Sequence, residues 1–315
     1  MSRVCEVIPD VMAGERVDKV VALLTGLARS DVAHLVDAGG VVLAGRPVLS
    51  RSRKVQTGQV LEIDVPDAGT DDVLVPDPSV PVAIVFEDAD VVVVDKPAGL
   101  VVHPGSGHRS GTLVHGLLAR YPELAGLADV DDPAGAERPG IVHRLDAGTS
   151  GLLVVARTPA ARRSLVAQLA ARAVDRRYWA LVWGHVAAPA GQVDAPIGRD
   201  DRDPTRMAVR VDGREARTGY EVLHRFDQPA AATLVECRLE TGRTHQIRVH
   251  LAAIGHPVVG DARYGGARRT RGPLALDRPF LHAHHLSFVH PVSGSDVVVD
   301  SVLPVDLERV RAALA

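Results

Sequence analysis

The chain of 315 residues contains only two cysteines, Cys5 and Cys237, which lie far apart in the sequence. Two isolated thiols support neither a disulfide framework nor a metal site built from closely spaced cysteines. No apolar run reaches the 18 residues that a transmembrane helix needs, and the first residues lack the basic start and apolar core of a secretory signal. We therefore expect a soluble cytoplasmic protein with no membrane partner.

Lysine is also scarce, since it occurs only at positions 19, 54 and 96, and arginine carries nearly all of the positive charge. The formal net charge of −3 argues against a protein that is strongly basic as a whole. Guanidinium groups are nevertheless suited to phosphate contacts and to stacking on bases. Binding of nucleic acid would therefore depend on local clusters of arginine.

Length and a hydrophobic content of 46% predict a globular chain with two domains. We predict a small domain over residues 1–68, a linker over 69–82 and a larger domain over 83–315. The linker sequence GTDDVLVPDPSVPV is rich in Asp and Pro and lacks periodicity, which is typical of an extended segment. Within the small domain, apolar spacing predicts two short helices, followed by short strands separated by Gly-containing turns. The residues expected on the buried helix faces are Val17, Val20, Val21, Leu24, Val32, Leu35 and Val36.

The stretch HRLDAGTSG, residues 143–151, places Asp146 directly before a glycine-containing turn that leads into the apolar run GLLVVA. A turn exposes its side chains while the flanking elements hold its backbone, which suits a catalytic carboxylate. Taken alone, however, an Asp in a turn more often caps the turn than performs catalysis.

Two further segments carry candidate site residues. The alternation in RRYWALVWG, residues 176–184, predicts a strand with Tyr178 and Ala180 on the same side. The sequence TGRTHQIRVHLAAIGHP predicts a helix that begins near Thr244 and ends at Gly255. Arg248 lies outside the apolar stripe of that helix and is free to reach a cleft. The residues expected on the stripe are Ile247, Leu251 and Ile254.

Considered together, HRLDAGTSGLLVVART, RRYWALVWG, GRTHQIRVHLAAIGHPVVGDARYG and FLHAHHLSFVHP resemble the RluA family of pseudouridine synthases, with DKPAGLVVHPG as a further match. The resemblance extends from about residue 84 to the C-terminus. RVDKVVALL and the segment after it resemble the S4-like (alpha-L) RNA-binding module of the family's RluD-like branch. The resemblance implies an α+β protein, in which this module precedes a catalytic domain with a mainly antiparallel mixed central sheet.

The resemblance also implies a reaction. Enzymes of this family detach uracil from C1′ of a uridine in RNA, rotate the base and rejoin it through C5, with no cofactor or metal. Asp146 would be the carboxylate that attacks either C1′ of the sugar or C6 of the ring, and Arg248 would be its ion-pair partner. Tyr178 would stack on the uracil and act as a general base. The target nucleotide must be flipped out of its helix to reach these groups.

The expected RNA contacts fall into two groups. In the catalytic domain, Arg144 matches a family position thought to enter the RNA where the base has left, and Leu281 would belong to the apolar wall of the pocket. His143, Arg243 and His245 are expected to face the RNA or support the site. In the module, residues 1–68 hold eight Lys or Arg and nine Asp or Glu, so only their arrangement can favour RNA. Phosphate contacts are expected from Arg16, Lys19, Arg29, Arg51, Arg53 and Lys54.

The expected partner is large-subunit (23S) ribosomal RNA, with transfer RNA as the other possibility, and the expected oligomeric state is a monomer. A noncatalytic RNA-binding or ribosome-assembly factor on the same scaffold is the alternative function. A zinc hydrolase is a third, because HAHH at residues 282–285 brings histidines together, but their spacing matches no common zinc pattern, so we predict no metal. The segment from Gly260 to Gly266 and the following ARRTRG predict a mobile loop. Three arginines expected to contact RNA there are Arg268, Arg269 and Arg271.

Overall fold

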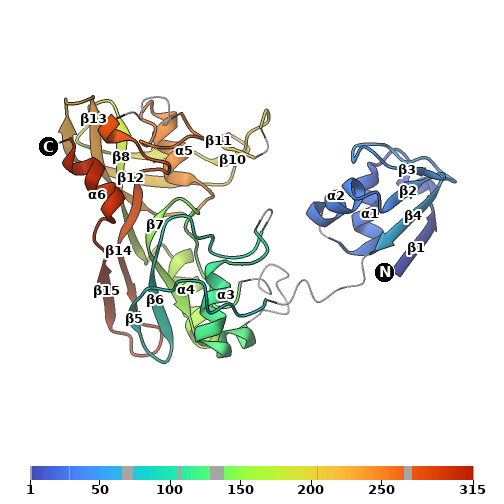
Figure 1. Cartoon of the computed structure of the whole chain (residues 1–315), viewed down its shortest axis with the longest axis horizontal. Helices are drawn as coiled ribbons and strands as arrows, with labels where there is room; N and C mark the ends of the chain where they lie inside the picture. The colour runs from blue at the N-terminus through green and yellow to red at the C-terminus, as the bar shows by residue number, and fades with distance from the viewer. Residues whose placement is uncertain are drawn as a thin grey trace. The chain divides into compact units, whose positions relative to one another are not determined.

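The computed structural model describes residues 2–27, 29–65, 74–105, 108–127, 138–203, 205–265 and 272–314. The chain divides into two compact units, residues 1–73 and 74–315 (Figure 1). No helix in the described ranges has both the length and the apolar character to cross a bilayer. Arg268, Arg269 and Arg271, which were expected to contact RNA, lie outside these ranges.

The first unit packs two helices against a small antiparallel sheet. The helices are α1 (Val17–Thr25) and α2 (Arg29–Asp37), and the sheet order is β1-β4-β2-β3. The strands are β1 (Ser2–Val7), β2 (Val41–Leu43), β3 (Arg46–Pro47) and β4 (Val60–Val65). The helix faces expected to be buried supply much of this core, with Leu24 only partly buried at its edge. The first strand was not predicted, because its six residues become a strand only by pairing with β4 along their whole length.

The described part of the predicted linker belongs to the second unit. Leu74 and Val82 pack against the core of that unit, and Val80 is buried. A Cβ added to Gly116 would lie 2.9 Å from Val80. The lack of a side chain at Gly116 therefore allows the segment to pack closely against α3 (Leu113–Arg120). The linker prediction is therefore wrong for residues 74–82, because three apolar side chains anchor a segment that has no periodicity of its own.

The second unit is built on a nine-stranded mixed sheet with the order β5-β6-β7-β14-β8-β13-β12-β9, in which β15 also pairs with β14. Among the described strand pairs of this sheet, β7 with β14 is parallel and the others are antiparallel. This confirms the expected α+β class and mainly antiparallel mixed sheet. The strands are β5 (Ile84–Glu87), β6 (Val91–Lys96), β7 (Ser150–Ala156), β8 (Asp175–Trp183), β9 (Ala190–Asp194), β12 (Arg217–Phe226), β13 (Ala232–Leu239), β14 (Leu281–Val289) and β15 (Asp296–Asp300).

Helices lie along both ends of this sheet. Figure 1 shows α3 and α4 (Pro159–Ala170) near β6 and β7, and α5 (Gln246–Ala253) near the separate hairpin of β10 (Ile197–Arg199) and β11 (Met207–Val209). The last helix, α6 (Val305–Ala312), buries Leu307 and Val310 in the main core. The expected stripe of α5 holds for Ile247 and Leu251 but not for Ile254, which is 38% exposed because the helix ends one residue earlier.

The two halves of the sheet meet at one short contact between β7 and β14. Only Ser150 and Gly151 pair there, with His282 and Ala283. Gly151 has a φ of +113°, and an added Cβ would lie 2.2 Å from the carbonyl oxygen of Ala283. A glycine is required at this crossing for both reasons. The turn that carries Asp146 runs directly into this contact, so the crossing fixes Asp146 relative to β14 and β8.

Candidate active site

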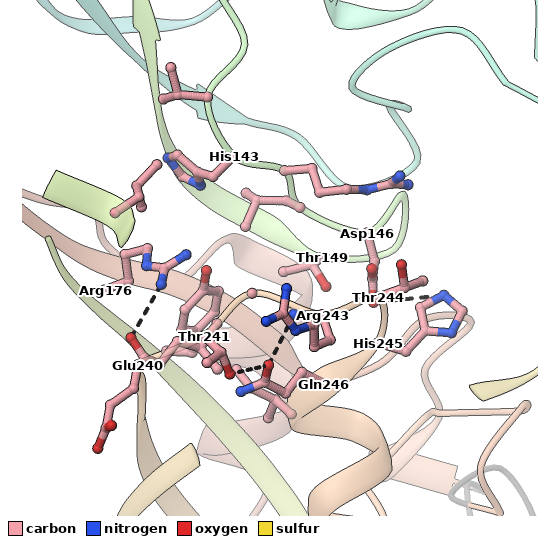
Figure 2. Close-up of a pocket in the computed structure, with 18 of the residues that line it drawn as sticks. His143, Asp146, Thr149, Arg176, Glu240, Thr241, Arg243, Thr244, His245 and Gln246 are labelled. Carbon is pink, nitrogen blue, oxygen red and sulfur yellow. Dashed lines mark hydrogen bonds and ion pairs between the residues drawn. The ribbon is translucent and has the colours of Figure 1, made fainter. Parts of the chain in front are cut away.

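One cavity of about 560 Å³ lies beside the crossing of β7 and β14 (Figure 2). Its volume is within the range of small-molecule and cofactor sites. The site residues expected in the larger domain all line it, namely Asp146, Tyr178, Arg248, Arg144, His143, Arg243, His245 and Leu281. They come from the turn before β7, from β8, from the start of α5 and from the start of β14.

The carboxylate of Asp146 is ion-paired with Arg248. Nη1 of Arg248 lies 3.0 Å from Oδ2 of Asp146, while its Nε and Nη2 donate to the two carboxylate oxygens of Asp261 at 2.6 and 2.9 Å. Asp261 is fully buried and also accepts hydrogen bonds from the backbone amides of Arg263 and Tyr264. The bidentate pair therefore fixes the plane of the guanidinium and aims its remaining nitrogen at Asp146.

The backbone of the Asp146 turn is held from two sides. Lys96, 1% exposed at the end of β6, donates from Nζ to the carbonyls of Pro97, Leu100 and Ala147 at 2.8, 2.9 and 3.3 Å. Burial lowers the pKa of this amine to about 7. Arg278 donates from Nη1 to the carbonyl of Gly148 at 3.3 Å. The DKPAG segment thus serves as a support for the turn rather than as a second reactive site.

The opposite wall is formed by the segment that leads into α5. Gln246 accepts at Oε1 from the Thr241 hydroxyl at 2.7 Å and from the Arg243 amide at 3.0 Å (Figure 2). His245 adopts a φ of +57°, in the left-handed region that non-glycine residues rarely occupy. Its Nε2 lies 4.0 Å from Oδ2 of Asp146. Burial lowers the pKa of His245, so it is neutral at pH 7 and Arg248 is the cation paired with Asp146.

The inner end of the cavity contains buried polar groups. Tyr178 is 4% exposed, and burial raises the pKa of its phenol. His143 accepts at Nε2 from the Val154 amide at 3.2 Å, while its buried Nδ1 has no partner. Burial and the nearby Arg176 lower the pKa of His143 to about 3, so the ring is neutral. Arg144 is exposed and lines the cavity.

The residues expected to contact RNA in the first unit, other than Arg29, lie around the start of α1. Arg16 bridges to Lys54 through the backbone, and the amide of Val17 donates to the carbonyl of Arg53 at 2.8 Å. The side chain of Arg16 is paired with Asp18 at 2.8 Å, and that of Lys19 with Glu15 at 2.8 Å. Lys54 and Arg51 are exposed and Arg53 is half-buried. Arg29 begins α2, but its side chain lies outside the described part of the structure.

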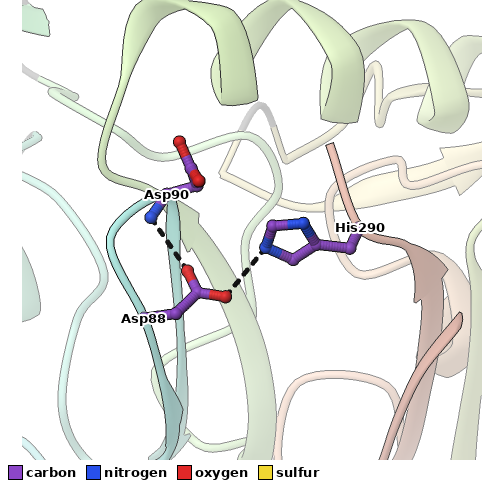
Figure 3. A group of neighbouring side chains, drawn as sticks. All are labelled: Asp88, Asp90 and His290. Atoms are coloured by element: carbon purple, nitrogen blue, oxygen red, sulfur yellow. Dashed lines mark hydrogen bonds and ion pairs between the residues drawn. The ribbon is translucent and has the colours of Figure 1, made fainter. Parts of the chain in front are cut away.

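Asp88, Asp90 and His290 form the one group with metal-ligating side chains close together among the described residues (Figure 3). Nδ1 of His290 accepts from the amides of Val292 and Ser293 at 3.3 and 3.0 Å, so Nε2 carries the proton and donates to Asp88 at 2.8 Å. The other oxygen of Asp88 accepts from the amides of Asp90 and Val91. Neither Nε2 nor Asp88 is free for a metal, and the group joins the β5–β6 turn to the end of β14.

The histidines of the HAHH segment are likewise bonded to protein. His282 contacts the Ser150 hydroxyl at 3.0 Å, His284 contacts Glu236 at 2.9 Å and stacks on Trp179, and His285 contacts Asp300 at 2.6 Å. Their partners lie on different strands, so the three rings do not converge on one point. This arrangement does not fit a zinc site, which needs converging ligands.

The family model for RNA pseudouridylate synthase matches residues 90–253, which include Asp146, Tyr178 and Arg248. The chain belongs to the RNA pseudouridine synthase family. It is therefore an isomerase that acts on RNA, and the residues that line its cavity lie in the matched region except for Leu281.

Known relatives span nearly the whole synthase. A ribosomal large subunit pseudouridine synthase D from Xanthomonas campestris is 44% identical, and the match covers 98% of this chain and 91% of the relative. An uncharacterized RNA pseudouridine synthase from Chloroflexus aurantiacus is 48% identical over 98% of this chain and 92% of its own length. Among solved structures, human RNA pseudouridylate synthase domain containing 1 is 30% identical with a TM-score of 0.55, covering 71% of this chain and 84% of that chain.

Sequence reasoning missed several residues that build the site of the synthase. Asp261 was assigned to a mobile loop, but it is buried and holds Arg248, and no local pattern distinguishes it. The sequence did contain an indication of Lys96, because it is one of only three lysines and ends a buried apolar run. Arg176 could also have been found from the sequence, since the alternation of side chains along a strand places it on the same side of β8 as Tyr178.

Acid should destabilise the second unit through His103, which is 5% exposed and lines the cavity. Burial lowers its pKa from 6.5 to about 4, so between these values the unfolded chain binds a proton that the folded chain does not. The associated stability is present above pH 6.5 and is lost as the pH falls toward 4, which amounts to about 2 kcal/mol at pH 5. We expect His103→Gln to lose less stability than the parent chain between pH 7.5 and 5.

Urea unfolding followed by tryptophan fluorescence measures this difference. The two tryptophans, Trp179 and Trp183, both lie on β8 and report on the second unit alone. His224→Gln, at an exposed histidine of β12, is the control and should match the parent chain at each pH. Equal acid losses in all three proteins would contradict the assignment to His103.

Proposed function

We propose that the synthase converts specific uridines of large-subunit ribosomal RNA to pseudouridine in the cytoplasm. Three full-length relatives that are 41–45% identical carry the name ribosomal large subunit pseudouridine synthase D. The observation that carries the chemistry is the Asp146 carboxylate, paired at 3.0 Å with an arginine that is itself fixed by Asp261.

In this proposal Asp146 is the catalytic carboxylate. The ion pair with Arg248 holds this carboxylate at the cavity, where it can attack C1′ of the sugar or C6 of the ring. One side-chain carboxylate is enough, because the reaction breaks one bond to uracil and forms another with no net change in atoms. The neutral state of His245 leaves Arg248 as the cation that sets the position of Asp146.

Tyr178 and Arg144 take the roles that their positions allow. The target nucleotide must leave its stack to reach a cavity whose inner wall is Tyr178. Because burial raises the pKa of Tyr178, the ring enters the reaction protonated, and we assign it to stacking on the uracil. Arg144 is exposed at the cavity, and its planar group can occupy the gap that the flipped nucleotide leaves.

We further propose that the first unit is an S4-like RNA-binding module that anchors the substrate. Its two helices and small sheet bring Arg16, Arg53 and Lys54 together beside the start of α1. The nearly equal numbers of basic and acidic residues in this unit make that grouping, rather than net charge, the support for phosphate binding.

The first experiment maps pseudouridines in total RNA that lacks the modification, after incubation with the parent synthase or with Asp146→Asn. We expect new pseudouridines in large-subunit ribosomal RNA that depend on Asp146, because the amide keeps the shape but loses the nucleophile. Asp212→Asn, at an exposed aspartate paired with Arg210 away from the cavity, is the matched control and should retain activity. New pseudouridines confined to transfer RNA would overturn the substrate assignment.

The role of the first unit is tested by Arg53→Ala combined with Lys54→Ala. Loss of two phosphate contacts should weaken RNA binding about 10-fold and make its dependence on salt shallower, while the chemical step on bound RNA stays unchanged. Arg3→Ala serves as the control, since Arg3 lies on β1 of the same unit and is paired with Glu62 and Asp64. An unchanged affinity and salt slope for the double variant would refute RNA binding at this surface.

A further inference from the structure

Arg176 is a buried cation in the active-site cavity without an acidic partner. Its residue is 6% exposed on β8, and it lines the cavity together with Tyr178. Nη2 donates to the carbonyl of Leu239 at 3.4 Å, and Nε has no hydrogen-bond partner. Among the residues that the structure describes, no carboxylate lies within ion-pair distance of this guanidinium.

The carboxylates near the cavity are committed elsewhere. Glu240 is paired with Arg172 at 3.1 Å and accepts from Gln192 at 2.7 Å. Asp146 and Asp261 share Arg248, so these three groups together carry one net negative charge. The side chains next to Arg176 do not neutralise its positive charge either, because Tyr178 is a protonated phenol and His143 is neutral.

An arginine in this position costs folding free energy. Burial without a carboxylate removes the water shell of the guanidinium, and the structure supplies one long carbonyl contact in return. Burial accordingly lowers the pKa of Arg176, although a guanidinium keeps its proton at neutral pH. Such a group is explained if a negative charge enters the cavity during the function of the protein.

The proposed reaction supplies that charge. If Asp146 attacks C1′, an ester bond forms to C1′ while the C1′–N1 electron pair moves onto N1, and uracil leaves as an anion whose charge is shared by O2 and O4. If Asp146 adds to C6, an ester bond forms to C6, the C5=C6 electron pair moves toward C4 and the charge reaches O4; the C1′–N1 bond then breaks and its electron pair stays on N1. In the return step C5 bonds to C1′, the bond to Asp146 breaks, C5 loses its proton and N1 gains one.

Both routes therefore move one negative charge from Asp146 to the uracil ring. Arg248 stabilises the charge in its starting position, because it is bonded to the Asp146 carboxylate. Figure 2 shows Arg176 and Asp146 on opposite sides of the cavity, with Thr149 between them in this view. A cation on the side of the cavity opposite Asp146 can interact with the negative charge once it is on the uracil ring. An interaction that forms only at that stage lowers the barrier and so accelerates the reaction.

We propose that Arg176 is a catalytic residue that binds and stabilises the anionic uracil ring formed when Asp146 attacks. This inference rests on the proposed isomerisation and adds a second cation to it. The site takes an anionic pyrimidine base and not a phosphate, because Arg176 lies at the buried inner end of the cavity while phosphates remain with the RNA backbone outside.

The test compares Arg176→Met and Arg176→Lys with the parent synthase in single-turnover reactions on an RNA that the parent modifies. We expect Arg176→Met to lower the rate of the chemical step about 100-fold or more, as the loss of a charge-stabilising donor does in other enzymes, with RNA affinity unchanged. Arg176→Lys keeps the charge and should recover part of the rate. Arg177→Met is the control, because Arg177 is the next residue on β8 and is paired with Asp175 at 2.8 Å.

Stability separates this role from a structural one. Removing a buried cation that has no partner should leave the melting temperature of Arg176→Met equal to or above that of the parent chain, while activity falls. A structural role predicts a lower melting temperature and no recovery with Arg176→Lys.

A second readout uses RNA with 5-fluorouridine at the target position. Fluorine withdraws electrons and stabilises the uracil anion by itself, so breakage of the N-glycosidic bond should depend less on Arg176. The rate ratio of parent to Arg176→Met should therefore be smaller for this RNA than for uridine, measured as loss of the N-linked nucleoside in digests.

Three results would overturn the inference: an unchanged rate for Arg176→Met, a loss confined to RNA affinity, or equal rate ratios for both RNAs. The second of these would assign Arg176 to the RNA backbone. A parent synthase that forms no pseudouridine in any RNA would instead refute the proposed function, and this inference with it.

Discussion

The proposed active site depends on how the three nitrogens of Arg248 are shared between two carboxylates. Two of them are bound by Asp261, which is fully buried, and the third is left for Asp146. Asp261 lies between α5 and β14, Arg248 lies on α5 and Asp146 precedes β7, so this one guanidinium joins three parts of the fold. Lys96 and Gly151 fix the Asp146 turn from the other side, so the carboxylate has little freedom to move.

Local features of the chain were predictable from the sequence because they depend on neighbouring residues. The faces of α1 and α2 and the position of Asp146 in a turn before a buried strand follow from short-range patterns. The resemblance added the pairing of Asp146 with Arg248, which are 102 residues apart. The direct ion pair is present in the structure.

Features that depend on distant contacts were not predictable in this way. The first strand exists through β4, and residues 74–82 look like a linker until α3 covers them. Asp261 reads as part of a Gly-rich loop, since nothing near it in sequence indicates that it binds an arginine 13 residues away on a helix. The strand periodicity places Arg176 on the same side of β8 as Tyr178. That Arg176 has no acidic partner among the described residues is visible only in the three-dimensional structure.

The most direct test of this account is the single-turnover rate of the Asp261→Asn variant. Asp212→Asn is the matched control, because Asp212 also forms a bidentate pair with an arginine, Arg210, but is exposed. The side chain of asparagine has only one acceptor oxygen, so it cannot accept hydrogen bonds from both Nε and Nη2 of Arg248. Nη1 of Arg248 is then no longer held in position to donate to Asp146. We predict a rate about 10- to 100-fold below the parent for Asp261→Asn, with unchanged RNA affinity, because small misplacements of a reacting group have costs of this order. A variant that is folded and modifies RNA at the parent rate would show that Asp146 does not depend on this clamp, and would contradict the account.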